Sequence, residues 1–239
     1  MSVPKRHDTA STLPWMREGT TFLLAVTDRL TDGHLREPSA LPGWTRAHVI
    51  GHVARNAEAL GRLAAWARTG VETPMYADQA QRAAEIETSA ALPPATLRED
   101  LRSTAADLEN ALDALDAGTW QAEVRSALGR AIPAAEIPWM RVREVWLHAV
   151  DLAAGATVAD LPPDVIDTLL DDVCGMLSTR PQCPAVRLAP LDRDRTWRLG
   201  PEDEEPAVID WTAARLLSWV TGRSAAPAPV ASVTLPPWL

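Results

Sequence analysis

A glutamate, a histidine and an aspartate lie in a helical segment, residues 139–155, whose other residues are mostly apolar. Glu144, His148 and Asp151 follow one another at helical spacing, which places them on a single stripe of a helix, roughly 10 Å long. Apolar residues flank this stripe on both sides, so we expect it to face the protein interior rather than solvent. A carboxylate and an imidazole one turn apart can bind a metal ion. The same spacing also occurs as an ordinary surface pair, which stabilises a helix by only a few tenths of a kcal/mol.

A second helix, expected over residues 45–70, carries two more potential ligands. His48 and His52 lie one turn apart on its same face. Metal sites in helical bundles often combine two ligands from one helix with a single ligand from a facing helix. Glu144 and His148 would form that pair, and either His52 or His48 would be the third ligand.

Two imidazoles and one carboxylate, with a vacant fourth position, form the donor set of a catalytic rather than a structural zinc site. Zinc suits this nitrogen-rich set best, while nickel, cobalt and iron accept the same types of ligand. Asp151 is expected either to accept a hydrogen bond from a metal ligand or to be an ordinary polar residue. The spacing leaves open whether Asp151 or His48 enters the coordination shell.

Long helices must position these residues. Apolar residues at helical spacing predict a short helix around Arg82 and long helices over residues 11–29, 45–70, 95–117 and 139–155. Four long helices joined by short or moderate loops are typical of a four-helix bundle. We therefore expect a mainly α protein in which residues 1–160 form a bundle that contains the metal site.

The pattern changes near residue 160, where the segment "TVADLPPDV" interrupts the helices. A helix over residues 163–179 is followed by three short segments with strand patterning: residues 185–190, 196–200 and 206–210. Asp210 is expected to cap a last helix over residues 211–221. Residues 161–239 are thus predicted to form a smaller α+β domain.

Composition narrows the class of protein. The 239 residues carry a formal net charge of −9 and show no run of basic residues, which argues against nucleic-acid binding. The sequence has neither an apolar signal segment nor about 18 consecutive apolar residues, so we expect a cytoplasmic protein that does not enter a membrane. Cys174 and Cys183 lack the spacing of a metal site and are expected to be buried or incidental thiols. We expect a monomer.

Longer segments give the chain a family resemblance. "LPGWTRAHVIGHVARNAEAL", "WARTGVETPMY" and "PWMRVREVWLHAVDL" closely resemble the mycothiol-dependent maleylpyruvate isomerases, which belong to the DinB-like superfamily of metal-binding four-helix bundles. The resemblance extends to "VTGR" near the C-terminus, so it covers essentially the whole chain. It implies an N-terminal bundle with a smaller C-terminal domain. It also implies that the metal ligands are His52, Glu144 and His148, a choice of His52 over His48 that periodicity cannot make.

The resemblance further implies a reaction and a thiol cofactor. Members of this family isomerise maleylpyruvate, a small dicarboxylate, to fumarylpyruvate in the gentisate route of aromatic degradation, with mycothiol as the cofactor. A thiolate that adds to a carbon–carbon double bond converts it to a single bond that can rotate, and elimination then gives the trans isomer. Because a thiol coordinated to zinc is deprotonated, the vacant metal position would supply the nucleophile.

Arginine is the expected partner of a dicarboxylate, since its guanidinium group can bind a carboxylate through two hydrogen bonds. By resemblance, Arg82 and Arg223 correspond to arginines near the family's active site and would bind the substrate. Asn56, one turn beyond His52 on the same face, is a candidate for contact with the thiol cofactor. Tyr76 would either line the pocket or pack its loop.

Two other functions are compatible with the same ligands. One is a mycothiol S-transferase, which would use the metal-activated thiol to conjugate electrophiles. The other is a noncatalytic bundle, in which the metal is absent or fully coordinated by protein. The presence of Arg82 and Arg223 favours the isomerase, because only the isomerase needs to bind two carboxylates.

Overall fold

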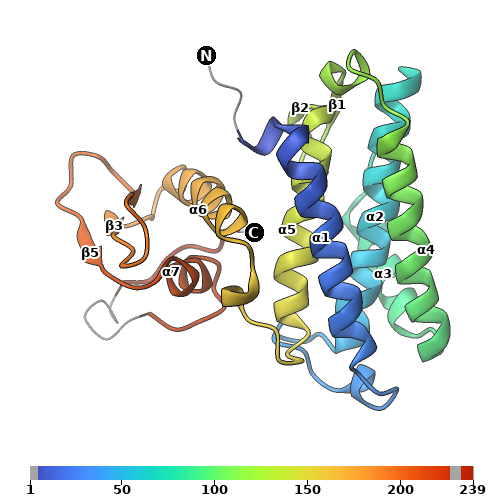
Figure 1. The fold of residues 1–239 in the computed structure, drawn as a ribbon, viewed down its shortest axis with the longest axis horizontal. Coiled ribbons are helices and arrows are strands. Elements are labelled where there is room, and N and C mark those ends of the chain that lie inside the picture. The colour runs from blue at the N-terminus through green and yellow to red at the C-terminus, as the bar shows by residue number, and fades with distance from the viewer. Residues whose placement is uncertain (1–4, 227–232, 239) are drawn as a thin grey trace. The chain divides into compact units, whose positions relative to one another are not determined.

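The computed structural model describes residues 5–226 and 233–238 of the chain (Figure 1). The chain divides into two compact units, Met1–Ala156 and Thr157–Leu239. The fold is mainly α with small sheets, as the sequence predicts. None of the described helices is long and apolar enough to cross a membrane.

The first unit is a helical bundle with one additional shorter helix (Figure 1). Its helices are α1 (Thr9–Asp28), α2 (Arg46–Thr69), α3 (Gln79–Ala90), α4 (Pro94–Asp113) and α5 (Ile137–Asp151). Helix α2 packs against α3, α4 and α5, while α1 packs against α5. The predicted four-helix bundle of α1, α2, α4 and α5 is therefore confirmed, and α3 packs against α2 in addition.

The ends of α2 follow the local sequence. Thr45 is its N-cap, and the Thr45 hydroxyl accepts a hydrogen bond from the His48 amide at 3.4 Å. The His48 ring completes a capping box, because its Nδ1 accepts from the Thr45 amide at 3.2 Å. Gly70 ends the helix in the left-handed region with a φ of +73°. Both predicted limits of this helix are confirmed.

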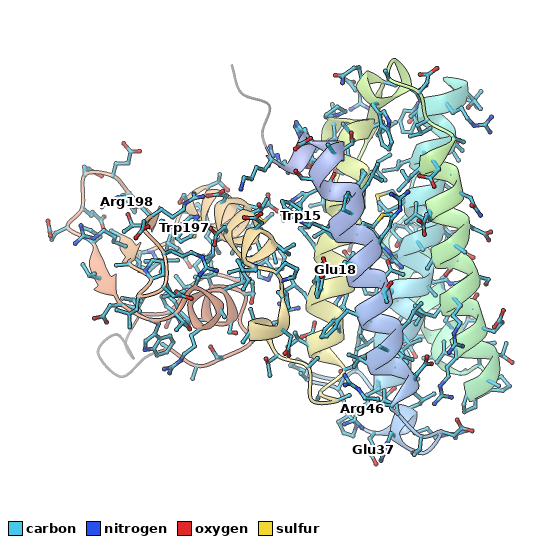
Figure 2. The ribbon with its side chains drawn as sticks, in the orientation of Figure 1. Trp15, Glu18, Glu37, Arg46, Trp197 and Arg198 are labelled. Atoms are coloured by element: carbon cyan, nitrogen blue, oxygen red, sulfur yellow. The ribbon has the colours of Figure 1, made fainter. Side chains whose placement is uncertain are left out.

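Arg46, the first residue of α2, links the start of this helix to the end of α5 (Figure 2). Its Nε donates to the Leu152 carbonyl at 2.7 Å, and its Nη2 donates to the Ala153 carbonyl at 3.2 Å. These charge-assisted bonds fix the N-terminus of α2 beside the C-terminus of α5. The two helices that carry the predicted metal ligands are thereby held in register.

Two glycines allow helices to pack closely against α5 and α2, the helices that carry the predicted metal ligands. A Cβ added to Gly19 of α1 would lie 2.6 Å from Trp146 Nε1 of α5. A Cβ added to Gly51 of α2 would lie 2.7 Å from the Ser89 Cβ of α3. Real Cβ atoms do not approach this closely, so only glycine permits these helix separations. Gly51 therefore sets the position of α3 next to His52.

Helix α4 ends at Asp113, four residues before the predicted end at residue 117. The reason is the turn that follows, in which the Asp116 carboxylate accepts from the Thr119 amide at 2.8 Å. This bond starts the 3₁₀-helix η3 (Thr119–Gln121) in place of another α-helical turn. A short antiparallel hairpin, β1 (Glu123–Arg125) with β2 (Ala131–Pro133), then leads toward α5.

The second unit contains two helices and a three-stranded sheet. Its elements are α6 (Pro163–Ser178), β3 (Val186–Leu188), β4 (Trp197–Leu199), β5 (Ala207–Ile209) and α7 (Ala213–Val220). The strand order is β4-β3-β5, with β3 antiparallel to β4 and parallel to β5. Each strand lies within a predicted segment, and the α+β class of this part of the chain is confirmed.

The predicted cap of the last helix is wrong. Thr212, and not Asp210, is the N-cap of α7, and its hydroxyl accepts from the Arg215 amide at 3.4 Å. The Asp192 carboxylate supplies a second acceptor, to the Ala213 amide at 2.8 Å. Because Asp192 comes from a distant loop, the sequence around Asp210 could not reveal this arrangement.

Candidate metal centre and active site

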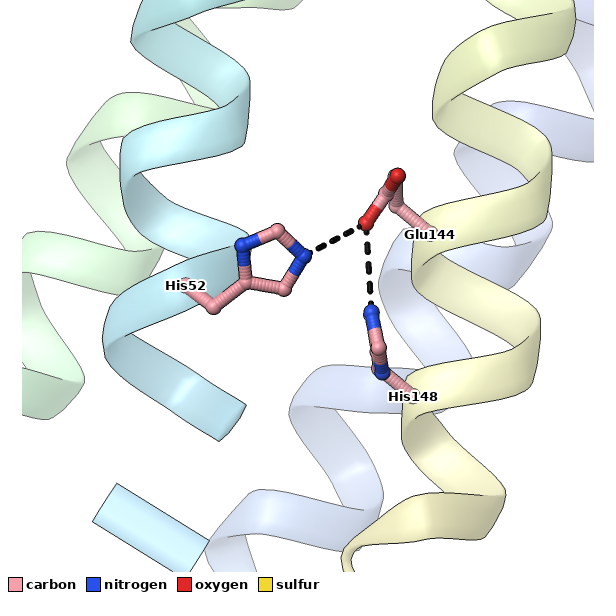
Figure 3. A group of neighbouring side chains, drawn as sticks. All are labelled: His52, Glu144 and His148. Carbon is pink, nitrogen blue, oxygen red and sulfur yellow. Dashed lines mark hydrogen bonds and ion pairs between the residues drawn. The ribbon is translucent and has the colours of Figure 1, made fainter. Parts of the chain in front are cut away.

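Helices α2 and α5 bring three potential metal ligands together inside the bundle (Figure 3). His52 of α2 and Glu144 and His148 of α5 each direct one ligand atom to a common point, and these atoms all lie within 4.8 Å of one another. The Glu144 Oε2 atom is 2.9 Å from His52 Nε2 and 3.2 Å from His148 Nε2. We call these three residues the triad. Their arrangement matches the set that the resemblance implies.

The triad is largely enclosed by the bundle. The His52 side chain is 6% exposed, and those of His148 and Glu144 are 15% and 18% exposed. The two imidazole rings meet edge to face, with centroids 4.8 Å apart. The two ligands on α5 are thus partly accessible to solvent, while His52 is almost fully buried.

Burial and mutual contact shift the pKa values of the triad. Burial lowers the pKa of His52, and the neighbouring Glu144 carboxylate only partly opposes this effect. Burial alone would raise the pKa of Glu144, but the two histidines outweigh it and hold that pKa well below its ordinary value. Glu144 is therefore an anion at neutral pH, as a metal ligand must be.

Asp151 lies behind His148, on the side away from the shared point of the triad. Its carboxylate is fully buried, and its Oδ2 is 2.9 Å from His148 Nδ1. Burial alone would lower the pKa of His148, but hydrogen bonds to Asp151 and Glu144 outweigh it and raise that pKa. A proton on Nδ1 shared with Asp151 leaves the Nε2 lone pair directed at the triad's centre. Of the two expectations for Asp151, this geometry favours the hydrogen-bond acceptor.

His48 occupies a different position from His52. Its Nδ1 belongs to the capping box with Thr45, and its Nε2 lies 3.3 Å from the Glu87 carboxylate. It is not a member of the group that could hold a metal. The indole of Trp44 lies near both histidines, with ring centroids 6.3 Å from His48 and 5.5 Å from His52.

The donor set fits a divalent metal. Two Nε2 atoms and one carboxylate oxygen converge from facing helices, and the buried Asp151 carboxylate fixes the tautomer of one of the two imidazoles. Such carboxylate–histidine pairs are a regular feature of zinc sites. A metal held by these three ligands would keep one coordination position for a reactant, as in catalytic zinc sites.

One of the two predicted substrate-binding arginines lies at the triad. Arg82 of α3 places its Nη2 3.4 Å from His52 Nδ1, and its guanidinium carbon is 5.9 Å from the centre of the Tyr76 ring. The guanidinium carbon of Arg62 is 5.8 Å from the centre of the same ring. Two cations therefore lie close to Tyr76, beside the site. Arg223 belongs to the second unit, where its Nη1 donates to the Thr221 carbonyl at 3.2 Å.

Asn56 lies one turn beyond His52 on α2 and is buried. Its Oδ1 accepts a hydrogen bond from Arg141 Nη1 at 2.9 Å. Sequence reasoning missed Arg141, although it precedes Glu144 by three residues and so lies on the same stripe of α5. The helical spacing from Glu144 is the sequence signal for Arg141, but arginine is not a metal ligand, so a search for metal ligands does not select it.

The comparisons with known proteins agree with this geometry. Residues 16–153 match the family described as the mycothiol maleylpyruvate isomerase N-terminal domain, and residues 160–237 match the corresponding C-terminal domain. A search of curated protein sequences finds no match.

Two solved structures are similar over nearly the whole chain. A crystal structure of the mycothiol-dependent maleylpyruvate isomerase is 34% identical, with a TM-score of 0.87, and the match covers 94% of this chain and 93% of that one. The structure of its H52A mutant matches with the same TM-score and coverage at 33% identity. The chain belongs to the mycothiol maleylpyruvate isomerase family.

Proposed function

We propose that this protein catalyses the mycothiol-dependent isomerisation of maleylpyruvate to fumarylpyruvate, a step in the gentisate route of aromatic degradation. The observation that carries the proposal is the convergence of His52, Glu144 and His148 at one point between α2 and α5. It occurs in a chain that matches both domains of this isomerase family and, over 94% of its length, two solved structures of such an isomerase.

The reaction must remove and then restore a double bond. Attack of a thiolate sulfur on one alkene carbon forms a carbon–sulfur bond, and the π electrons move to the adjacent carbonyl as an enolate. Rotation about the new single bond follows. Return of the enolate electrons reforms the double bond and expels the thiolate, which leaves the cofactor unchanged.

His52, Glu144 and His148 would hold a divalent metal, for which zinc is our proposal. When bound, such a metal supplies Lewis acidity that lowers the pKa of a thiol enough to give the nucleophile at neutral pH. Asp151 keeps a proton on Nδ1 of His148, so that Nε2 remains available as a ligand. The buried setting of His52 favours its neutral form, which is the form able to donate a lone pair.

Cationic side chains would orient the substrate. Arg82 lies beside His52 and carries donors for one carboxylate of maleylpyruvate. Arg223 of the second unit is proposed to bind the substrate as well, on the strength of the family resemblance. Asn56 is proposed to contact the thiol cofactor, although its Oδ1 is engaged by Arg141 and only its amide nitrogen would serve.

A mycothiol S-transferase is the second candidate, because it would use the same triad. The two activities differ in the fate of the thiol. An isomerase returns mycothiol after each turnover, whereas a transferase consumes one thiol per product. The pair of arginines supports the isomerase.

The test supplies zinc-loaded protein with excess maleylpyruvate and a small, known amount of mycothiol. We expect many molecules of fumarylpyruvate per molecule of thiol, with the thiol recovered at the end. Consumption of the thiol with formation of an adduct, and no trans product, would assign the protein to the transferases instead.

We further propose that residues 1–160 form the metal-binding domain and residues 161–239 the C-terminal domain. The division of contacts after Ala156 and the limits of the two family matches support this boundary. We also propose that the protein is a cytoplasmic monomer. Cys174 and Cys183 are free thiols, which suits a reducing compartment.

A further inference from the structure

Arg141 is a charged side chain in the core of the bundle. It is 1% exposed, and its Nη1 donates to the Val53 carbonyl at 2.7 Å and to Asn56 Oδ1 at 2.9 Å. These two bonds fix one edge of the guanidinium group against α2. A buried arginine with such defined partners has a fixed orientation, which is a requirement for recognising a ligand.

The position of Arg141 relates it directly to the triad. It lies one turn before Glu144 on α5, and its partner Asn56 lies one turn after His52 on α2. The two helices run in opposite directions, because His52 faces Glu144 while Asn56 faces Arg141. Arg141 therefore forms the next layer of the bundle below the triad.

The second nitrogen of this guanidinium lacks an acceptor. Arg141 Nη2 is buried and has no hydrogen-bond partner within the described part of the chain. Burial lowers the pKa of Arg141 to about 10, so the group is still a cation at neutral pH. A buried cationic donor without an acceptor is unfavourable, and such groups normally have a partner in the working state of a protein.

The surroundings favour an anionic partner. Glu144 is the carboxylate that acts on Arg141 electrostatically, and it is already shared by two histidines. Tyr76 also acts on Arg141, and the guanidinium carbons of Arg62 and Arg82 lie 5.8 and 5.9 Å from the centre of its ring. Three positive charges are thus near Tyr76, whereas Glu144 is the one carboxylate among the described residues that acts on Arg141, and a small anion would balance this charge.

We propose that Arg141 binds a carboxylate of the substrate through Nη2, in the layer below the triad. The inference rests on the proposed function, which requires a dicarboxylate, and it adds a specificity-determining residue to Arg82. The two arginines approach from different helices, α5 and α3. Arg82 lies at the Nδ1 side of His52, so the two carboxylates of one substrate would have separate binding groups.

A purely structural role is the competing explanation. Arg141 would then only balance the charge of Glu144 and link α5 to α2, and its Nη2 would contact water. That role predicts that replacement of Arg141 reduces stability or metal content and leaves dicarboxylate affinity unchanged. The two explanations therefore differ in a measurement of binding that does not depend on turnover.

The experiment uses maleate, a cis-dicarboxylate that cannot complete the reaction, and the Arg141→Lys variant, which keeps the charge but loses the planar pair of donors. Calorimetric titration of the metal-loaded full chain should give a dissociation constant for maleate at least about tenfold higher in this variant than in the wild type. Metal content should be unchanged. Arg143→Lys, the same replacement two residues further along α5, is the matched control and should bind maleate normally.

Equal maleate affinity in the wild type and Arg141→Lys would overturn the proposal, as would a wild type that does not bind maleate. Should Arg141→Lys fail to fold, a crystal structure of the wild type with maleate decides instead. A carboxylate oxygen within hydrogen-bonding distance of Arg141 Nη2 supports the proposal, and maleate bound only elsewhere overturns it. Failure of the proposed function would look different, because the wild type would bind maleate through Arg141 and yet not isomerise maleylpyruvate.

Discussion

Replacement of Asp151 by asparagine tests whether the hydrogen bond from His148 to Asp151 strengthens metal binding by His148. In the wild type the buried Asp151 carboxylate lies 2.9 Å from His148 Nδ1. Asparagine has the same shape but no charge, and its amide can present a donor where an acceptor is needed. Loss of such a partner typically weakens metal binding about 10- to 100-fold. At pH 8 we therefore expect Asp151→Asn to bind zinc more weakly by about 1.4–2.7 kcal/mol.

The loss of zinc affinity caused by Asp151→Asn should become smaller as the pH falls. Burial lowers the pKa of His148, but hydrogen bonds to Asp151 and Glu144 outweigh it, so that the folded-state pKa is raised. Zinc must displace the proton of His148. As the pH falls, the wild type therefore begins to lose affinity for zinc while the pH is still above the ordinary pKa of histidine. Without the Asp151 charge this pKa drops, so Asp151→Asn loses affinity only at lower pH. The ratio of the two dissociation constants should shrink between pH 8 and pH 6.

Competition with a chromophoric zinc chelator measures the zinc dissociation constants at pH 8 and their ratio as the pH falls. Glu87→Gln is the matched control, because it also removes a carboxylate from a histidine, His48, at 3.3 Å. His48 is not in the triad, so this variant should bind zinc like the wild type at every pH. If Asp151→Asn binds zinc as tightly as the wild type at pH 8, the assigned role of Asp151 is wrong.

Three further outcomes are expected. The double variant Cys174→Ser/Cys183→Ser should retain turnover, because both thiols are buried in the second unit and burial raises their pKa values; loss of turnover in a folded sample would refute the external-thiol mechanism. Gly51→Ala should lower the free energy of unfolding by about 1–3 kcal/mol in denaturant titrations, because its Cβ would clash with Ser89; an unchanged midpoint would contradict the packing described. Arg82→Met should raise the KM for maleylpyruvate about tenfold or more in steady-state assays at unchanged zinc content, and an unaltered KM would exclude Arg82 as a substrate ligand.

Much of the first unit could be predicted from the sequence because its determinants are local. Thr45 and Gly70 mark the limits of α2 through short-range capping bonds, and helical periodicity alone places Glu144 and His148 on one stripe. Periodicity could not separate His48 from His52, since both lie on one face. In the structure they differ because the His48 ring is used for capping at the first turn, and only His52 lies deep enough to meet α5.

Other features depend on contacts between distant segments. Arg82 reaches His52 because Gly51 lets α3 approach α2 closely, and no local pattern encodes that separation. The cap of α7 involves Asp192 from another loop. Arg141 is an intermediate case, since its spacing from Glu144 was visible but its burial and its bond to Asn56 require α2. Local sequence patterns therefore do not identify the residues that act through tertiary contacts.

The proposed mechanism requires that His52, with Glu144 and His148, holds the metal on which thiol-dependent isomerisation depends. The most direct test measures zinc content and fumarylpyruvate formation in the same samples of wild type, His52→Ala and His48→Ala, with mycothiol present or omitted. We predict that the wild type and His48→Ala bind zinc and turn over only with mycothiol, while folded His52→Ala does neither. Turnover by His52→Ala without bound metal, or by the wild type without mycothiol, would contradict the account.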